Sequence, residues 1–225
     1  MHGLKHAYPI IQNQAQCSYG GNQRWLRRRD LQQCGCGVVA MADLALYLTR
    51  HHGFDGPEEA VQDPVPLEAY DRLCSRLQLR YLPMVPPLGI TGVGLAAGIG
   101  LYFRMHGIPL QAFWGVRTKN LWSAMADMLD RDLPVIFAIG PNFPIVWAKH
   151  RLNLYRKTPD GRYVAVSRVK GHYITATGLD ETWVQISSWG KEYYIHREEY
   201  EQYGKQHSLS LTNNLLWLRK KQVNA

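Results

Sequence analysis

One apolar segment constrains the fold of this chain more than any other. Residues 37–50, GVVAMADLALYLTR, are apolar on nearly every side of a helix, and Asp43 is the one charged residue that interrupts the run. A helix that is apolar all round packs in the interior of a fold. We therefore expect this helix at the centre of the molecule, ending near Gly53, Gly56 and Pro57, which break helices.

Two cysteines, Cys34 and Cys36, stand directly before this helix in the sequence QQCGCG. At a helix N-terminus, unpaired backbone N–H groups and the helix dipole favour a thiolate over a thiol. We therefore expect a lowered pKa at Cys36, and a thiolate is an effective nucleophile. Gly37 would let a substrate carbonyl approach the backbone, and the same N–H groups would face the oxyanion that develops there.

The remaining sequence predicts helices first and strands afterwards. Apolar residues at helical spacing predict helices over 58–82, 93–106 and 120–133, with a loop at 83–92 and a short strand at 111–116. From residue 134 onward, short β-branched and aromatic runs separated by turns predict an antiparallel sheet. These runs are 134–140, 162–169, 172–180, 182–190 and 192–196, followed by a helix or turn at 197–206 and a strand or helix at 213–221.

This order of elements predicts an α+β fold, with a helical lobe packed on a sheet. We expect residues 1–24 to form a polar arm on the surface. The rest is expected to form one domain over 25–225, with its helical lobe at about 25–130 and its sheet lobe at about 131–225. The 225 residues, 46% of them hydrophobic, are enough for one full core.

The chain is basic, with 26 Lys and Arg against 18 Asp and Glu and a formal net charge of +8. Such a charge favours anionic partners in general. However, no recognition-helix, zinc-finger or RNA-binding aromatic motif accompanies it. We interpret it as a solvated basic surface and expect no nucleic-acid partner; the alternative, nucleic-acid binding, predicts a steeply salt-dependent affinity.

Neither a signal peptide nor a membrane span is expected from the apolar segments. The first 16 residues lack a long apolar run, and the most apolar stretch, 88–103, is short and contains five glycines. Four cysteines are too few for a dense disulfide framework in a chain of this length, so we expect reduced thiols. These features favour a cytoplasmic protein without a membrane partner or a cofactor, and leave its oligomeric state open.

A cysteine nucleophile requires a base, and His172 is the strongest candidate because it begins the strand-like run HYITATGLD. A histidine on a strand is held more rigidly than one on a loop. About one hairpin later, the sequence ISSWG offers Ser187 or Ser188 as acceptors for the imidazole N–H. Trp189 would shield that hydrogen bond from water.

Taken together, these motifs resemble the papain-like cysteine peptidase superfamily. A cysteine opening a central helix, a distant histidine on a strand and then an Asn/Ser-Ser-Trp-Gly stretch follow the order of that superfamily. GCGVVAMADLALYL is similar to the helix start of bacterial peptidases that cleave double-glycine leader peptides, and of their stand-alone cytoplasmic relatives. The resemblance covers 32–48 and 171–195 well, the middle of the chain loosely and the N-terminal arm not at all.

The resemblance implies a papain-like fold and a cysteine peptidase or amide hydrolase acting through a thioester. Cys36 matches the nucleophile, His172 the general base, and Ser187 the position where papain-type members carry Asn and leader peptidases usually carry Asp. Gly37, Ser188 and Trp189 are expected to line the cleft. The substrate would be a peptide or another amide.

Two departures from the family pattern weaken this expectation. A hydroxyl at residue 187 contributes no negative charge to an imidazolium, so the Cys–His ion pair would be weaker. The family's oxyanion glutamine lies about six residues before the cysteine, where this chain has Asp30 or Leu31; Gln23 is our first candidate and Gln33 the second. A catalytically weak or inactive peptide-binding protein and an acyltransferase therefore stay as alternatives.

Two other motifs compete with this interpretation. Cys34 and Cys36 could contribute to a zinc site with His51 and His52, but structural zinc sites favour Cys-x2-Cys pairs, so we expect no metal. The glycine-rich stretch 89–94 lacks the Gly-Lys-Ser/Thr ending of a phosphate-binding loop. It is expected to make a tight turn and at most a wall of the cleft.

Overall fold

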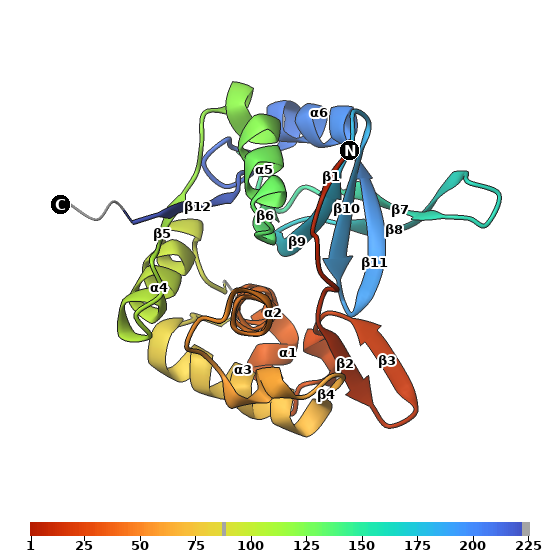
Figure 1. Cartoon of the computed structure of the whole chain (residues 1–225). Helices are drawn as coiled ribbons and strands as arrows, with labels where there is room; N and C mark the ends of the chain where they lie inside the picture. Colours follow the sequence, from red (N-terminus) through yellow and green to blue (C-terminus); the bar gives the residue numbers. More distant parts are fainter. Residues whose placement is uncertain (87–88, 222–225) are drawn as a thin grey trace.

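The helix that opens at Cys36 runs through the middle of the molecule (Figure 1). A computed structural model describes residues 1–86 and 89–221; residues 87 and 88 of the expected 83–92 loop, and the last four residues of the expected domain, lie outside the described residues. Helix α2 (Cys36–His52) is buried along most of its length. It packs against helix α3 (Leu67–Tyr81) and strand β9 (His172–Leu179), which confirms the expected central helix.

The fold is a mixed α+β arrangement with antiparallel sheets, as expected from the order of elements. The other helices are α1 (Arg29–Cys34), α4 (Gly92–Met105), α5 (Leu121–Asp130) and α6 (Arg197–His207), with 3-10 turns at η1 (Gln23–Trp25), η2 (Glu58–Val61) and η3 (Thr118–Asn120). The prediction of a single helix over 58–82 is wrong for the first third of that range. Pro64 and Pro66 interrupt it there, so that η2 and a short strand precede α3.

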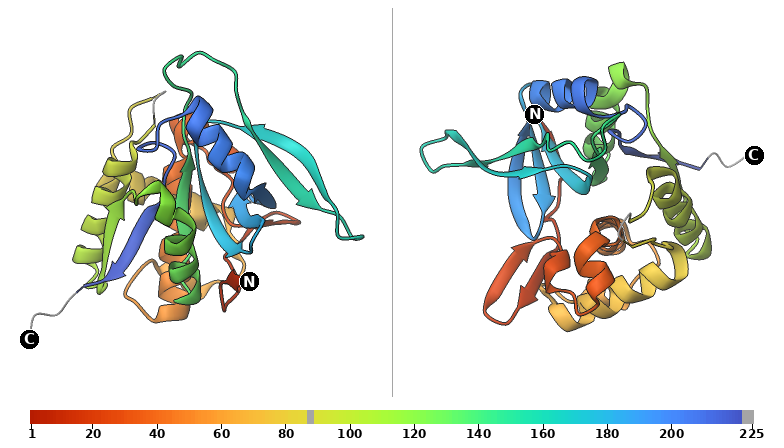
Figure 2. Two further views of the ribbon diagram at one scale, coloured as in Figure 1. Left: turned by 90° about the horizontal axis from the view of Figure 1, so that it is seen from above. Right: turned by 180° about the vertical axis from the view of Figure 1, so that it is seen from behind.

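In the main sheet, β9 pairs with three other strands, β1, β6 and β10, and all pairs are antiparallel. Its strands are β1 (His2–Gly3), β6 (Val135–Ile139), β7 (Leu152–Lys157), β8 (Tyr163–Val169), β9, β10 (Trp183–Ser188) and β11 (Lys191–His196). Both β1 and β6 pair with one edge of β9, and β10, β11, β7 and β8 follow from its other edge. The hairpin of β7 and β8 projects beyond the body of the molecule (Figures 1 and 2).

Two small sheets complete the fold. Strand β5 (Leu110–Trp114) pairs with β12 (Leu216–Lys220), so the element expected at 213–221 is a strand. Strands β2 (Ile10–Asn13), β3 (Gln16–Tyr19) and β4 (Val65–Pro66) form the other sheet. The expectation of a purely superficial N-terminal arm is wrong, because Tyr8 and Ile11 are buried and β1 joins the main sheet.

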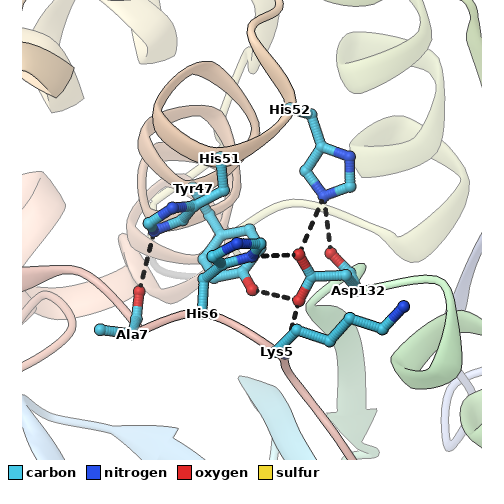
Figure 3. A network of polar contacts seen from close by, with 7 residues as sticks. All are labelled: Lys5, His6, Ala7, Tyr47, His51, His52 and Asp132. Atoms are coloured by element: carbon cyan, nitrogen blue, oxygen red, sulfur yellow. Dashed lines mark hydrogen bonds and ion pairs between the residues drawn. The ribbon is translucent and has the colours of Figure 1, made fainter.

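The far end of α2 is tied to the N-terminal segment by a polar network around Asp132 (Figure 3). The Asp132 carboxylate accepts hydrogen bonds from the backbone N–H of Lys5 and from the hydroxyl of Tyr47, and it pairs with His6 and His52. Burial alone would raise the pKa of Asp132, but its hydrogen-bond donors outweigh this and lower it. No described helix is long and apolar enough to cross a bilayer.

Candidate functional site

Cys36 is the first residue of α2, with Gly35 as the N-cap residue. The first intrahelical hydrogen bond runs from Val39 N–H to Gly35 C=O, which leaves the earlier N–H groups of the helix without intrahelical partners. The Cys36 side chain is half-buried. Sequence reasoning therefore placed this thiol correctly at the start of the central helix.

His172 begins β9, which packs against α2, and its side chain is buried. Cys36 and His172, far apart in the chain, line the same cavity of about 310 Å³. They also line a smaller cavity of about 20 Å³ that continues between α2 and the sheet. Within the described part of the chain, no direct hydrogen bond joins the sulfur to the ring, as is common in sites without substrate.

The two serines of the ISSWG sequence have different roles. Ser188 Oγ lies 3.0 Å from Nε2 of His172. Ser187 Oγ instead donates a hydrogen bond to the backbone carbonyl of Tyr19, at 2.7 Å. The assignment of Ser187 as the group that orients the imidazole is therefore wrong. Successive side chains on a strand point to opposite faces, so only one of the two serines can face His172.

Trp189 covers the His172 ring, as the sequence predicted. The two rings stack with centroids 4.7 Å apart and planes inclined by 23°. This placement depends on the turn between β10 and β11, in which Trp189 and Gly190 both have positive φ angles. The two-residue turn has the left-handed geometry that suits the twist of a hairpin. The guanidinium of Arg24 lies 5.5 Å from the centroid of Trp189.

Gln23 is the better placed of the two expected oxyanion donors. It is buried and lines both cavities beside Cys36, whereas Gln33 is exposed and lines only the larger one. The Nε2 group of Gln23 donates to the backbone carbonyl of Gln32 at 2.9 Å. One of its two amide hydrogens therefore fixes the side chain, and the other is available to a ligand.

A glycine pair upstream of Gln23 brings this segment against α2. The N–H of Gly21 donates to the Asp43 carboxylate, at 3.1 and 3.0 Å from its two oxygens. A Cβ atom at Gly21 would lie 2.0 Å from the Tyr70 hydroxyl, so no larger residue fits there without displacement. Asp43, which sequence reasoning noticed only as an interruption of an apolar helix, therefore holds the loop that carries Gln23.

The expected role of Gly37 as part of the cleft wall is wrong. Its Cα faces Ile90, whose Cγ2 would lie 2.9 Å from a Cβ atom built on Gly37. Ile90 and Tyr173 cover the Cα of Gly37, so that Gly37 lines neither cavity, and the Tyr173 hydroxyl donates to Ile90 C=O at 3.0 Å. Both residues line the larger cavity, as do Gly89, Thr91 and Gly92, so the glycine-rich stretch is a cavity wall.

The electrostatics of the pair differ from the sequence expectation. Burial raises the pKa of the Cys36 thiol, and the backbone N–H groups of Tyr173, Gly37 and Cys36 offset only part of this effect. The expected lowering of this pKa is therefore wrong. Burial lowers the pKa of His172 to about 4, and the positive charge of Arg24 acts in the same direction. At neutral pH the resting pair is a thiol beside an uncharged imidazole.

The proposed zinc ligands lie at opposite ends of α2. Cys34 and Cys36 precede or open the helix, whereas His51 and His52 close it, roughly 24 Å away along its axis. All four cysteines are free thiols. The Cys34 thiol donates to the backbone carbonyl of Asp30 at 3.1 Å and lines the larger cavity.

Comparisons with protein-family models, with curated proteins and with solved structures find no match to this chain.

Proposed function

We propose that this protein is a cysteine hydrolase of papain-like architecture that cleaves a peptide or another amide. The observation that supports the proposal most strongly is the shared cavity of Cys36 and His172, one at the start of a buried helix and the other at the start of a buried strand. A hydroxyl partner for the imidazole and a covering tryptophan accompany them. The resemblance of both motifs to the papain-like superfamily points to the same chemistry.

In the proposed reaction, the Cys36 sulfur attacks the acyl carbon of the substrate while His172 takes the thiol proton at Nδ1. A tetrahedral intermediate forms, and its oxyanion accepts hydrogen bonds from Gln23 and from the free N–H groups at the start of α2. The C–N bond then breaks, the imidazolium gives its proton to the leaving amine, and a thioester remains on Cys36. Water attacks the thioester with His172 again acting as the base, which regenerates the thiol.

The pKa values require proton transfer during attack, because the resting pair carries no charge. Neutral His172 is available as a base at neutral pH. The thiol keeps its proton until a bound substrate aligns the sulfur with the ring, and the proton passes to His172 as the S–C bond forms. Such an enzyme would be slower than one with a preformed ion pair, and a bound substrate would activate it.

The test uses a peptidyl epoxysuccinate, which alkylates a cysteine only after binding beside it. The full-length protein is incubated with the probe near neutral pH, and each cysteine is quantified by mass spectrometry. We expect modification at Cys36 about 100-fold faster than at exposed Cys17, and loss of this preference in His172→Ala. Cys34→Ser is the matched control and is expected to react like the wild type. Equal labelling of Cys17 and Cys36 would refute the proposal.

A catalytically silent peptide-binding protein is the second candidate, and the raised thiol pKa and lowered imidazole pKa favour it. It predicts that peptides bind in the cavity without a thioester ever forming. Acyl transfer uses the same covalent step as hydrolysis and differs only in the acceptor. Trapping with hydroxylamine separates the silent protein from a hydrolase or an acyltransferase. A hydroxamate product requires an acyl-enzyme, which the silent protein cannot make.

A further inference from the structure

An exposed apolar loop follows the strand that forms one wall of the cavity. Between β6 and β7, four apolar side chains of the loop 143–147 are exposed: Phe143 by 48%, Ile145 by 51%, Val146 by 61% and Trp147 by 79%. Exposed apolar residues that are contiguous, unlike scattered ones, mark interaction sites. This cluster is the largest run of exposed large apolar residues in the described chain.

The base of this loop is built from specific contacts. The buried side chain of Asn142 donates to the backbone carbonyl of His150 and to the Tyr203 hydroxyl, each at 3.1 Å. Lys170 donates to the backbone carbonyl of Ala148. The ends of the loop are therefore held together while its apolar tip faces solvent, and the segment arches away from the body of the molecule (Figure 2).

Positive charge is concentrated in the segment of the chain that contains this loop and the β7–β8 hairpin after it. Residues 141–170 contain seven Lys and Arg against one Asp, so they carry +6 of the +8 net charge of the chain. The basic residues are Lys149, Arg151, Arg156, Lys157, Arg162, Arg168 and Lys170. Arg162 pairs with Asp160, but Lys149, Arg151 and Arg168 form no ion pair within the described residues. Most of the net positive charge of the chain thus lies on this loop and on the hairpin that follows it, with Lys149 and Arg151 next to the loop itself.

We propose that the 143–147 loop and the surrounding basic residues bind the surface of a membrane that contains anionic lipids. A projecting loop with exposed Trp and Phe side chains inserts into the boundary between headgroups and acyl chains, where these side chains are favourable. Nearby Lys and Arg attract the anionic headgroups. A membrane fits better than a nucleic acid, because Ile145 and Val146 gain free energy in hydrocarbon but cannot stack on bases.

The loop starts at the cavity, which relates this surface to the candidate site. Gly140 and Pro141 line the larger cavity, and Gly171 N–H donates to Gly140 C=O at 3.2 Å. A protein held by this loop would present its cavity beside the bilayer. The lipid-binding proposal departs from the sequence expectation of no membrane partner, and it is independent of whether Cys36 is catalytic.

The experiment measures co-sedimentation of the full-length protein with vesicles of phosphatidylcholine alone, or with 30% phosphatidylglycerol. We expect affinity for the anionic vesicles to exceed that for the neutral ones by about tenfold or more, and to fall as salt is added. The double variant Ile145→Ser/Trp147→Ser is expected to lose about tenfold in affinity. The control is Leu79→Ser, which removes an apolar side chain exposed by 73% on α3 and is expected to bind like the wild type.

A second variant tests the electrostatic part, and an oligonucleotide tests the competing partner. Lys149→Gln/Arg151→Gln is expected to weaken binding to anionic vesicles and to reduce its salt dependence, with circular dichroism confirming that each variant is folded. The proposal fails if the wild type does not sediment with anionic vesicles, or if the Ile145/Trp147 variant binds them undiminished. Binding of a single-stranded 20-mer that depends on Trp147, without vesicle binding, would assign the surface to nucleic acid instead.

Discussion

At the residue scale, the partner of His172 decides which ring nitrogen carries the proton. If Nε2–H donates to Ser188 Oγ, then Nδ1 has a free lone pair and can accept a proton from Cys36. A serine hydroxyl, however, both donates and accepts hydrogen bonds, so it tolerates either tautomer. An amide side chain can be turned so that its carbonyl oxygen accepts from Nε2–H, which holds the productive tautomer more firmly. Ser188 therefore supports the tautomer that the proposed reaction needs, but selects it only weakly.

We therefore predict that Ser188→Ala slows the reaction of Cys36 with a peptidyl epoxysuccinate by about tenfold, because neither ring orientation nor tautomer is then held. Ser188→Asn is expected to react at least as fast as the wild type. The matched control is Ser187→Ala, which removes the hydrogen bond to Tyr19 but leaves the imidazole contact intact. A larger effect of Ser187→Ala than of Ser188→Ala on the inactivation rate would contradict this assignment.

At the scale of elements, the turn between β10 and β11 positions the tryptophan that covers His172. Gly190 has a φ angle of 72°, and a Cβ atom there would lie 2.8 Å from Cβ of Ser18. The N–H of Tyr19 also donates to Gly190 C=O at 3.0 Å. The turn therefore needs glycine both for its left-handed backbone and for its close approach to β3.

Gly190→Ala is expected to lower the free energy of unfolding by about 3 kcal/mol, through backbone strain and overpacking against Ser18. Gly161 provides a matched control, since its φ angle is also positive, at 84°, but a Cβ atom there would meet no other atom within 4 Å. Gly161→Ala is expected to cost about 1 kcal/mol from strain alone. Urea unfolding measures both values, and equal costs would show that the contact with β3 is unimportant.

The helix and strand that carry Cys36 and His172 could be predicted from the sequence, whereas the serine that contacts His172 and the pKa of Cys36 could not. The apolar pattern of 37–50 and the β-rich run at 172 predicted the central helix and strand, because burial leaves a strong periodic signal in composition. The choice between Ser187 and Ser188 depends on strand register, and a register shift between Gln185 and Ile186 alters it. No local pattern predicts such a shift. The pKa of Cys36 was also missed, because its burial depends on residues distant in the chain, such as Tyr173.

At the scale of the whole molecule, two buried titratable groups face the same small cavity with opposite effects on stability. Burial raises the pKa of Asp43 to about 6 from 3.8, and burial lowers the pKa of His172 to about 4 from 6.5. Between about pH 4 and 6, both groups are therefore uncharged in the folded protein. In the unfolded chain, over the same range, the carboxyl is largely ionised and the imidazole largely protonated.

The signs of the two contributions follow from these pKa values. The contribution of Asp43 to the free energy of unfolding is fully present below pH 3.8 and is lost as the pH rises through 6. Over this range the carboxyl ionises in the unfolded chain but stays protonated in the folded protein, which favours unfolding. Stability from His172 is fully present above pH 6.5 and is lost as the pH falls through 4, because the unfolded chain binds the proton first. Each group changes the free energy of unfolding by about 3 kcal/mol between its folded-state and its unfolded-state pKa. The two contributions nearly cancel in the wild type.

Removing either group should therefore reveal the pH dependence of the other. The stability of Asp43→Asn, relative to the wild type, is expected to rise by about 3 kcal/mol between pH 4 and 6.5, because the compensating loss from Asp43 is gone. The relative stability of His172→Gln is expected to fall by a similar amount over the same range. Differences from the wild type, measured by urea unfolding at several pH values, cancel the titration of all other groups. Parallel stability profiles for both variants would mean that neither group is buried in its uncharged form, and would remove the basis for a neutral thiol–imidazole pair at the candidate site.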